Sequence, residues 1–146
     1  MLISKKWLAT TNCRGHAAER RASGSMKKQT SGTTLAKAAQ CYIETHYQQN
    51  FSLEQMANVL FVSGCYLMRA FKQYTGTTPL NYHHMVRCKK AKELLLQTDM
   101  SISKVGESVG FVSSSHFSHI FRKTEGCTPS EYRMSHKNED HEETEQ

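Results

Sequence analysis

The chain has 146 residues, 38% of them hydrophobic, which is enough for one domain or for two very small ones. Lys and Arg number 19 against 13 Asp and Glu, and the formal net charge of +6 favours a polyanionic partner, either nucleic acid or an anionic membrane surface. No apolar run approaches the roughly eighteen residues of a membrane span, and the amino end lacks the apolar core of a signal peptide.

The two ends of the chain differ from its middle in charge and in pattern. Residues 1–32 carry seven Lys or Arg against one acid and show no hydrophobic periodicity. Residues 137–146, KNEDHEETEQ, carry one basic residue against five acids. The sequence therefore predicts a disordered basic arm over 1–32, a folded domain over 33–136 and an acidic disordered tail over 137–146.

Three helices are predicted in the first half of the folded domain. Apolar residues recur every three or four positions over 35–48, which predicts the first helix. Ser52 with Gln55 forms a capping-box pattern, which begins the second helix. Ser63 caps the third helix, over 63–75, which ends at Gly76. The residues expected on the buried faces are Leu35, Ala38, Ala39, Tyr42, Ile43, His46 and Tyr47, then Leu53, Met56, Ala57 and Leu60, then Leu67, Ala70 and Phe71.

The second half repeats this pattern after a long helix. Thr78-Pro79 is typical of an N-cap followed by a first helical residue, and it begins a linker helix over about 79–97. Ser101 begins the next helix, and Ser113 caps the one after it, over 113–125. Thr128-Pro129 begins the last helix. The expected inward residues are Tyr82, Met85, Cys88, Ala91, Leu94 and Leu95, then Ile102, Val105 and Val109, then Phe117, Ile120 and Phe121. No alternating stretch predicts a strand, so the expected fold is all-α.

An internal duplication underlies the repeat. Ser63–Tyr82 aligned on Ser113–Tyr132 gives identity at Ser, Phe, Gly, Thr, Pro and Tyr, and the helices before them match with one extra residue near Gly110. Two short helices with a tight break, the second polar on its outer face, make a helix-turn-helix. We therefore expect two helix-turn-helix subdomains, over about 35–78 and about 101–136, joined by the linker helix.

The spacing of the two helix-turn-helix units fits the repeat of the DNA major groove. A 19-residue linker helix spans roughly 28 Å, close to the roughly 34 Å between successive major-groove faces of DNA. The major groove is wide enough to admit a helix. One chain could then insert two recognition helices, 63–75 and 113–125, into adjacent major-groove segments of double-stranded DNA.

These segments resemble the DNA-binding domain of the AraC/XylS family of bacterial transcription regulators over about residues 35–133. The most specific stretch is VGFVSSSHFSHIFRKTEGCTPSEYR, which resembles the family's carboxy-terminal signature over its whole length. The resemblance implies about seven helices, a monomeric grip on DNA at two sites, and transcription activation through contact with RNA polymerase.

The resemblance also implies which residues contact DNA. The positions that match the family's DNA-contacting residues are Cys65, Met68 and Arg69 in the first recognition helix and Ser114, Ser115, Ser118 and His119 in the second, with Lys72 and Arg122 as candidates for phosphate contact. The sequence departs from the family pattern at His119, where a basic residue is common, and at Gly106, where Ala is common. Glycine in a helix interior costs about 1 kcal/mol relative to Ala.

Two further interpretations stay open for the function. Cys65 and Met68 are poor hydrogen-bond donors, which also fits a protein–protein interaction module that has weak or lost specific DNA binding. About 34 residues precede the domain, too few for a core of their own, so the chain is either a stand-alone regulator or a fragment without a sensor domain.

Catalytic chemistry is not expected. The chain has two Asp residues, Asp99 and Asp140, and Asp140 lies in the acidic tail. Neither a nucleophilic triad nor a Gly-rich phosphate loop is readable in the sequence. Some DNA-repair methyltransferases carry a cysteine-rich zinc domain before a similar DNA-binding domain, but the amino-terminal segment here has the single Cys13. We therefore expect neither a cofactor nor an enzyme.

Metal binding is not expected either, and the cysteines indicate a reduced compartment. His116 and His119 share one helix, but Cys127, the cysteine nearest to them in sequence, falls past the helix end. The five cysteines are widely and irregularly spaced without a CxxC pair, which is typical of reduced thiols in a cytoplasmic protein. Cys41 and Cys88 are expected to act as small core residues.

Overall fold

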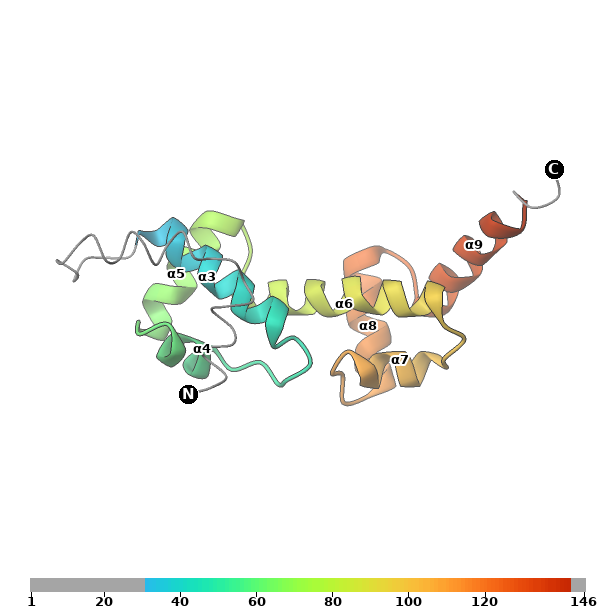
Figure 1. Ribbon diagram of the computed structural model, residues 1–146, viewed down its shortest axis with the longest axis horizontal. Helices are drawn as coiled ribbons and strands as arrows, with labels where there is room; N and C mark the ends of the chain where they lie inside the picture. The colour runs from blue at the N-terminus through green and yellow to red at the C-terminus, as the bar shows by residue number, and fades with distance from the viewer. Residues whose placement is uncertain (1–30, 143–146) are drawn as a thin grey trace. The chain divides into compact units, whose positions relative to one another are not determined.

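The computed structural model describes residues 31–142, with side chains up to residue 137, so the predictions for residues 1–30 and 143–146 lie outside the described residues. Helices make up the regular structure of this part, and residues 31–142 contain no strand. In chain order they are α3 (Gly32–Thr45), α4 (Leu53–Val59), α5 (Gly64–Thr75), α6 (Pro79–Gln97), α7 (Ile102–Ser108), α8 (Ser114–Glu125) and α9 (Pro129–Glu142) (Figure 1). The all-α prediction is confirmed.

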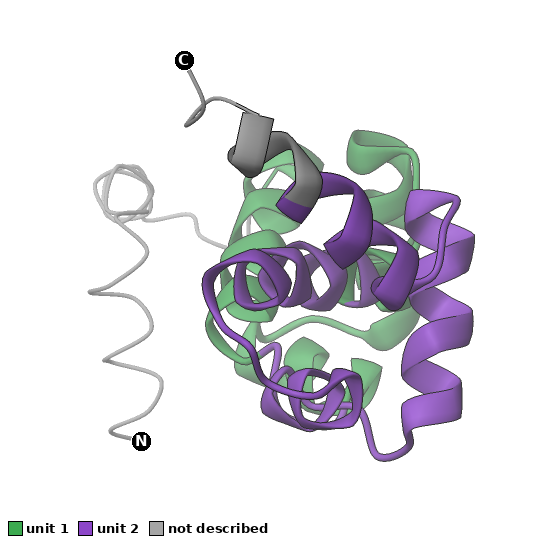
Figure 2. Ribbon diagram, turned by 90° about the vertical axis from the view of Figure 1, so that its right-hand side faces the viewer, with its two compact units in different colours: residues 1–46, 51–83 green, residues 47–50, 84–146 purple. Residues whose placement is uncertain are grey.

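The described residues fall into two compact units (Figure 2). Unit 1 comprises residues 31–46 and 51–83, and unit 2 comprises residues 47–50 and 84–142. Unit 1 contains α4 and α5, unit 2 contains α7 and α8, and the boundary falls inside α6. The helix pairs α4–α5 and α7–α8 therefore each lie within one unit, whereas residues 47–50, which the sequence places in the first subdomain, belong to unit 2.

The helix boundaries follow from short-range chemistry that the sequence spells out. Five helices have a serine N-cap whose hydroxyl accepts a hydrogen bond from the backbone N–H three residues later, a contact worth about 1 kcal/mol each. These caps are Ser31, Ser52, Ser63, Ser101 and Ser113. At the other end, α5 and α8 stop at glycines with φ of 80° and 85°, a left-handed conformation that glycine adopts without steric cost.

The start of α9 has a complete capping box. The Thr128 hydroxyl accepts from the Glu131 backbone N–H at 3.2 Å, and the Glu131 carboxylate accepts from the Thr128 N–H at 2.7 Å. This backbone hydrogen bond lowers the pKa of Glu131. From Pro129, α9 continues to Glu142, into the segment that the sequence predicts as a disordered tail.

Unit 1 is held by apolar side chains from its three full helices. Both α3 and α4 pack against α5. The buried residues are Leu35, Ala36, Ala39 and Ile43 from α3, Met56 and Ala57 from α4, and Leu67, Ala70 and Phe71 from α5. Burying each Leu, Ile or Phe side chain contributes about 1.5–3 kcal/mol, so these contacts dominate the stability of the unit.

Unit 2 has a core rich in aromatic rings. Phe111 lies 5.2 Å from Phe117, Phe117 lies 5.7 Å from Phe121, and Phe121 lies 5.7 Å from Tyr132, measured between ring centroids. Around this chain of rings lie the buried side chains Cys88, Ala91, Leu95, Val105 and Val109. Cys88 thus occupies the core as predicted, and burial raises its pKa to about 11, whereas Cys41 in unit 1 is only partly buried.

Arg87 is a buried charge that the sequence analysis missed. It is 5% exposed, its Nε donates to the Tyr47 carbonyl at 2.6 Å, and its Nη2 donates to the Gln49 carbonyl at 2.8 Å. Its guanidinium carbon also stands 5.1 Å from the Phe111 ring centroid, a cation–π geometry. Arg87 therefore fixes the 47–50 segment to unit 2 through backbone acceptors.

One predicted inward residue of α6 is wrong. Met85 is 48% exposed, and the neighbouring Val86 and Arg87 are buried instead. The helix belongs to unit 1 up to His83 and to unit 2 from His84. A helix divided between two cores does not need a single apolar stripe along its length. The predicted stripe, which included Met85, is therefore wrong at that residue.

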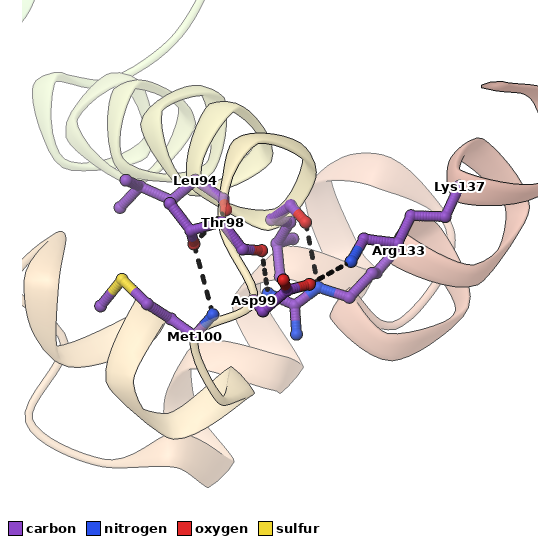
Figure 3. Close-up of polar contacts among 7 residues, drawn as sticks. Leu94, Thr98, Asp99, Met100, Arg133 and Lys137 are labelled. Atoms are coloured by element: carbon purple, nitrogen blue, oxygen red, sulfur yellow. Dashed lines mark hydrogen bonds and ion pairs between the residues drawn. The ribbon is translucent and has the colours of Figure 1, made fainter.

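The carboxyl end of α6 is capped from α9 (Figure 3). Arg133 Nε donates to the Leu95 carbonyl at 3.0 Å, and Arg133 Nη2 reaches the Thr98 carbonyl at 3.5 Å. Lys137 forms an ion pair with Asp99 in the loop that follows. Arg133 thereby satisfies carbonyls that a helix end leaves without intrahelical partners.

Gly106 is a packing position in unit 2. A Cβ atom there would lie 2.9 Å from Phe117 Cδ1 and 3.0 Å from Phe117 Cγ, closer than real Cβ atoms approach. In unit 1 the residues aligned with this pair are Ala57 and Leu67, both buried. Unit 2 therefore has a larger residue in α8, Phe117 in place of Leu, and a smaller residue in α7, Gly106 in place of Ala. The helix-propensity cost of Gly106 is offset because the missing Cβ leaves space for the Phe117 ring.

A small polar cluster lies at the edge of the unit 2 core. His84 stands 5.9 Å from His116 and 6.3 Å from Phe111, measured between ring centroids. Burial lowers the pKa of His84, and the nearby charges of His116, Arg87 and Lys123 lower it further. The folded unit therefore favours neutral His84.

Gly106→Ala should destabilise unit 2 although alanine is the better helix former. Overpacking costs about 1–3 kcal/mol and the helix propensity returns about 1 kcal/mol, so we expect a net loss of about 1 kcal/mol in thermal or urea unfolding. Adding Phe117→Leu should relieve the clash. Gly64→Ala is the matched control, because its Cβ would meet Leu53 at an ordinary 3.6 Å. A higher melting temperature for Gly106→Ala alone would contradict the packing interpretation.

Acidification should destabilise unit 2 through His84. Unfolded histidine has a pKa of about 6.5, and the folded pKa lies below it, so stability is full above about pH 6.5 and declines as the pH falls further. Urea unfolding at about pH 7.5 and about pH 5.5 should show a smaller decline for His84→Gln than for the unchanged chain. Equal declines in the free energy of unfolding of the two proteins would show that His84 does not cause the destabilisation by acid.

Candidate nucleic-acid interface

The outward face of α5 carries the predicted contacts of the first recognition helix. Cys65, Met68, Arg69 and Lys72 stand at positions i, i+3, i+4 and i+7, so they lie on one side of the helix. Met68 is partly buried and the other three are exposed. We call these four residues the α5 stripe. The opposite side packs into the core of unit 1 through buried residues such as Phe71.

The outward face of α8 repeats this spacing. Ser115, Ser118, His119 and Arg122, here called the α8 stripe, stand at i, i+3, i+4 and i+7 and face away from the buried rings of α8. Ser118 is partly buried and the other three are exposed. Ser114, the first residue of α8, lies to one side of the stripe and is exposed. Each predicted set of site residues thus lies on the outward side of its own helix.

The two recognition helices are positively charged. α5 has no acidic residue, and Glu125, the single acid of α8, pairs with Lys92 at 2.9 Å. Among the described residues, Arg69, Lys72 and Arg122 form no ion pair within 4.0 Å, although the charge of Arg122 helps to lower the pKa of Glu131. Cations without a close acidic partner suit phosphate binding, because Lys and Arg that neutralise phosphates supply most of the salt-dependent affinity of a DNA-binding protein.

The lysines of the linker helix behave differently. Lys92 is held by Glu125, and Lys90 lies 3.3 Å from Glu93 on the same helix. The Glu125 carboxylate raises the pKa of Lys92. Of the three lysines of α6, Lys89, Lys90 and Lys92, the last two therefore have acidic partners within unit 2, which favours a solvated face over a DNA contact.

Phe61, in the turn between α4 and α5, was missed as a candidate. Its side chain is 94% exposed and its φ is 58°, a left-handed conformation that costs roughly 1–2 kcal/mol in a residue with a Cβ. Phe61 N–H donates to the Asn58 carbonyl as Gly110 N–H donates to Glu107, so glycine occupies the same place in the second turn. The alignment of Phe61 with Gly110 was the sequence feature that could have identified Phe61 as a candidate.

The part of the chain that the structure describes offers no metal centre and no membrane span. Among those residues, no group of three or more His, Cys, Asp or Glu side chains is placed to hold a metal ion. None of the described helices has both the length and the apolar character that crossing a bilayer requires.

Known proteins match the same part of the chain. Residues 56–135 match the family described as "Helix-turn-helix domain". The HTH-type transcriptional activator RhaS of Enterobacter sp. (strain 638) is 38% identical over 93 residues, 64% of this chain and 34% of RhaS. The bifunctional transcriptional activator/DNA repair enzyme AdaA of Bacillus subtilis (strain 168) is 31% identical over 99 residues, 68% of this chain and 47% of AdaA.

A solved structure extends the similarity to the fold. The DNA-binding domain of AdpA, a global transcriptional factor crystallised with a target DNA, matches with a TM-score of 0.66 and 28% identity, covering 72% of this chain and 94% of that domain. The chain spans about a third of the length of RhaS and under half that of AdaA. With more than half of its residues matched, the chain belongs to the AraC/XylS family of transcription regulators and carries the family's helix-turn-helix DNA-binding domain.

Proposed function

We propose that the chain binds double-stranded DNA in a sequence-specific manner as a bacterial transcription regulator. The observation that carries the proposal is the pair of outward stripes, each set at the same helical spacing over an apolar opposite face. In a helix-turn-helix the second helix lies in the major groove with its outer residues against base edges. α5 and α8 would each occupy one of two adjacent groove segments.

The residue types assign the roles within each stripe. Arg69 has the planar fork that fits the O6 and N7 atoms of guanine, which makes it the strongest candidate for a base contact in α5. The hydroxyls of Ser114, Ser115 and Ser118 and the imidazole of His119 can donate to or accept from base edges. Lys72 and Arg122 stand one to two turns further along their helices and would neutralise phosphates.

Activation is the regulatory direction that the relatives support. RhaS and AdaA are both named transcriptional activators. For this chain, activation through contact with RNA polymerase, a monomeric mode of binding and action in the cytoplasm are parts of the proposal. AdaA is also named a DNA repair enzyme, whereas the function proposed here is DNA binding without catalysis.

Selection of bound sequences from a random duplex pool tests the proposed function. We expect enrichment of two half-sites about one helical turn apart, each with specified bases. Failure to enrich any sequence would overturn specific DNA binding. Enrichment of a single half-site would restrict reading to one unit.

The salt dependence of binding separates DNA binding from the interaction-module alternative. A protein that neutralises several phosphates loses affinity steeply as salt rises, because the released counterions enter a more concentrated solution. An apolar protein–protein contact has no such slope. We expect a steep linear fall of log affinity against log salt on the selected duplex.

Arg69→Ala should weaken binding to the selected duplex by about 1–3 kcal/mol, because it removes a base or phosphate contact. Arg69→Lys keeps the charge but loses the bidentate fork, so it should relax the base preference more than it lowers affinity. Lys37→Ala is the matched control, since Lys37 is an exposed cation of the same unit on α3. Unchanged affinity of a folded Arg69→Ala protein, measured by gel shift, would argue against the assignment.

A further inference from the structure

The two stripes differ in chemistry at aligned positions. Cys65 of the α5 stripe corresponds to Ser115 of the α8 stripe, and Met68 corresponds to Ser118. A thiol is a weak hydrogen-bond donor and a thioether donates none, whereas a serine hydroxyl both donates and accepts. The first recognition helix therefore offers sulfur and methyl groups where the second offers hydroxyls.

Phe61 is an aromatic residue close in sequence to the start of α5. It lies two residues before Ser63, the N-cap of α5, and its ring is almost fully exposed. Its left-handed backbone is strained, and a ring with so little packing cannot offset that strain within the fold. Backbone strain that the fold does not relieve is typical of residues that make a functional contact.

One group in the major groove matches such a surface. The C5-methyl group of thymine is the apolar feature of the groove, and Phe and other apolar side chains contact it directly. The amino-terminal residues of a recognition helix are those that reach base edges, and Cys65 is the second residue of α5.

We propose, on the basis of the function proposed above, that unit 1 recognises thymine by apolar contact with its methyl group. Cys65, Met68 and Phe61 are then specificity-determining residues, while unit 2 reads its half-site through hydrogen bonds. The cations of the α5 stripe favour DNA over an apolar protein partner, because Arg69 and Lys72 continue the same face of the helix.

Uracil substitution tests this directly, because deoxyuridine in place of thymidine removes the methyl group and leaves the hydrogen-bonding groups. Each thymine of the selected duplex is replaced singly, and affinity is measured for each duplex. We expect a loss of about threefold to tenfold at one or two positions in the half-site bound by unit 1. In the half-site bound by unit 2 we expect less than about a twofold change. Relaxed base preference in Arg69→Ala identifies the unit 1 half-site.

Variants link the loss to named side chains. Cys65→Ser and Met68→Ala should weaken binding to the thymine duplex and abolish its advantage over the uracil duplex, whereas Ser118→Ala should leave that advantage intact. Phe61→Gly should also reduce the advantage while its melting temperature is at least preserved, because glycine relieves the left-handed strain. The melting measurement shows that the variant is folded.

The outcomes separate this inference from the proposed function. Specific binding that is insensitive to uracil in both half-sites overturns methyl recognition and leaves the regulator proposal standing. A pool that yields no preferred sequence overturns the proposed function itself. If Phe61→Gly keeps full uracil sensitivity but loses transcription activation, Phe61 serves a protein partner, and its place in methyl recognition is wrong.

Discussion

The rotation of each recognition helix about its axis is fixed by the two large side chains that it buries. In α5, Leu67 and Phe71 point into the core of unit 1, and in α8, Phe117 and Phe121 point into the core of unit 2. Because successive residues are about 100° apart, this burial sends positions 65, 68, 69 and 72, or 115, 118, 119 and 122, outward together. The surface that we assign to DNA is therefore a consequence of the core.

The two copies reach this common geometry with different residues. Unit 1 pairs Ala57 with Leu67, and unit 2 pairs Gly106 with Phe117, so the volume that one helix adds is removed from the other. Protein interiors tolerate such exchanges when total volume is kept. Unit 2 also anchors the 47–50 segment through Arg87. The copies have diverged in packing and in surface chemistry while keeping the same outward spacing.

Much of the fold could be predicted because its determinants are local. The serine caps, the terminal glycines and the Thr-Pro starts act within four residues of a helix end, and the duplication makes each half support the other. The burial of Arg87 could not be predicted, since its acceptors are carbonyls about forty residues away and leave no periodic signal. A single apolar stripe along α6 predicts Met85 on the buried side, but this helix serves two cores and leaves Met85 exposed.

The candidate site was predictable in position and less so in chemistry. Helical spacing predicts both stripes, and the sequence already shows that Cys65 offers only a weak hydrogen-bond donor and Met68 offers none. Phe61 was absent from the predicted site: glycine at the aligned position 110 indicates its left-handed backbone, but its exposure is evident only in the folded structure.

An NMR titration of isotope-labelled protein with the selected duplex tests most directly whether both outward stripes face DNA. We expect the largest chemical-shift changes to fall on the α5 stripe and on the α8 stripe at the same stoichiometry. Changes confined to one of these helices, or centred on α3 or α9, would contradict it.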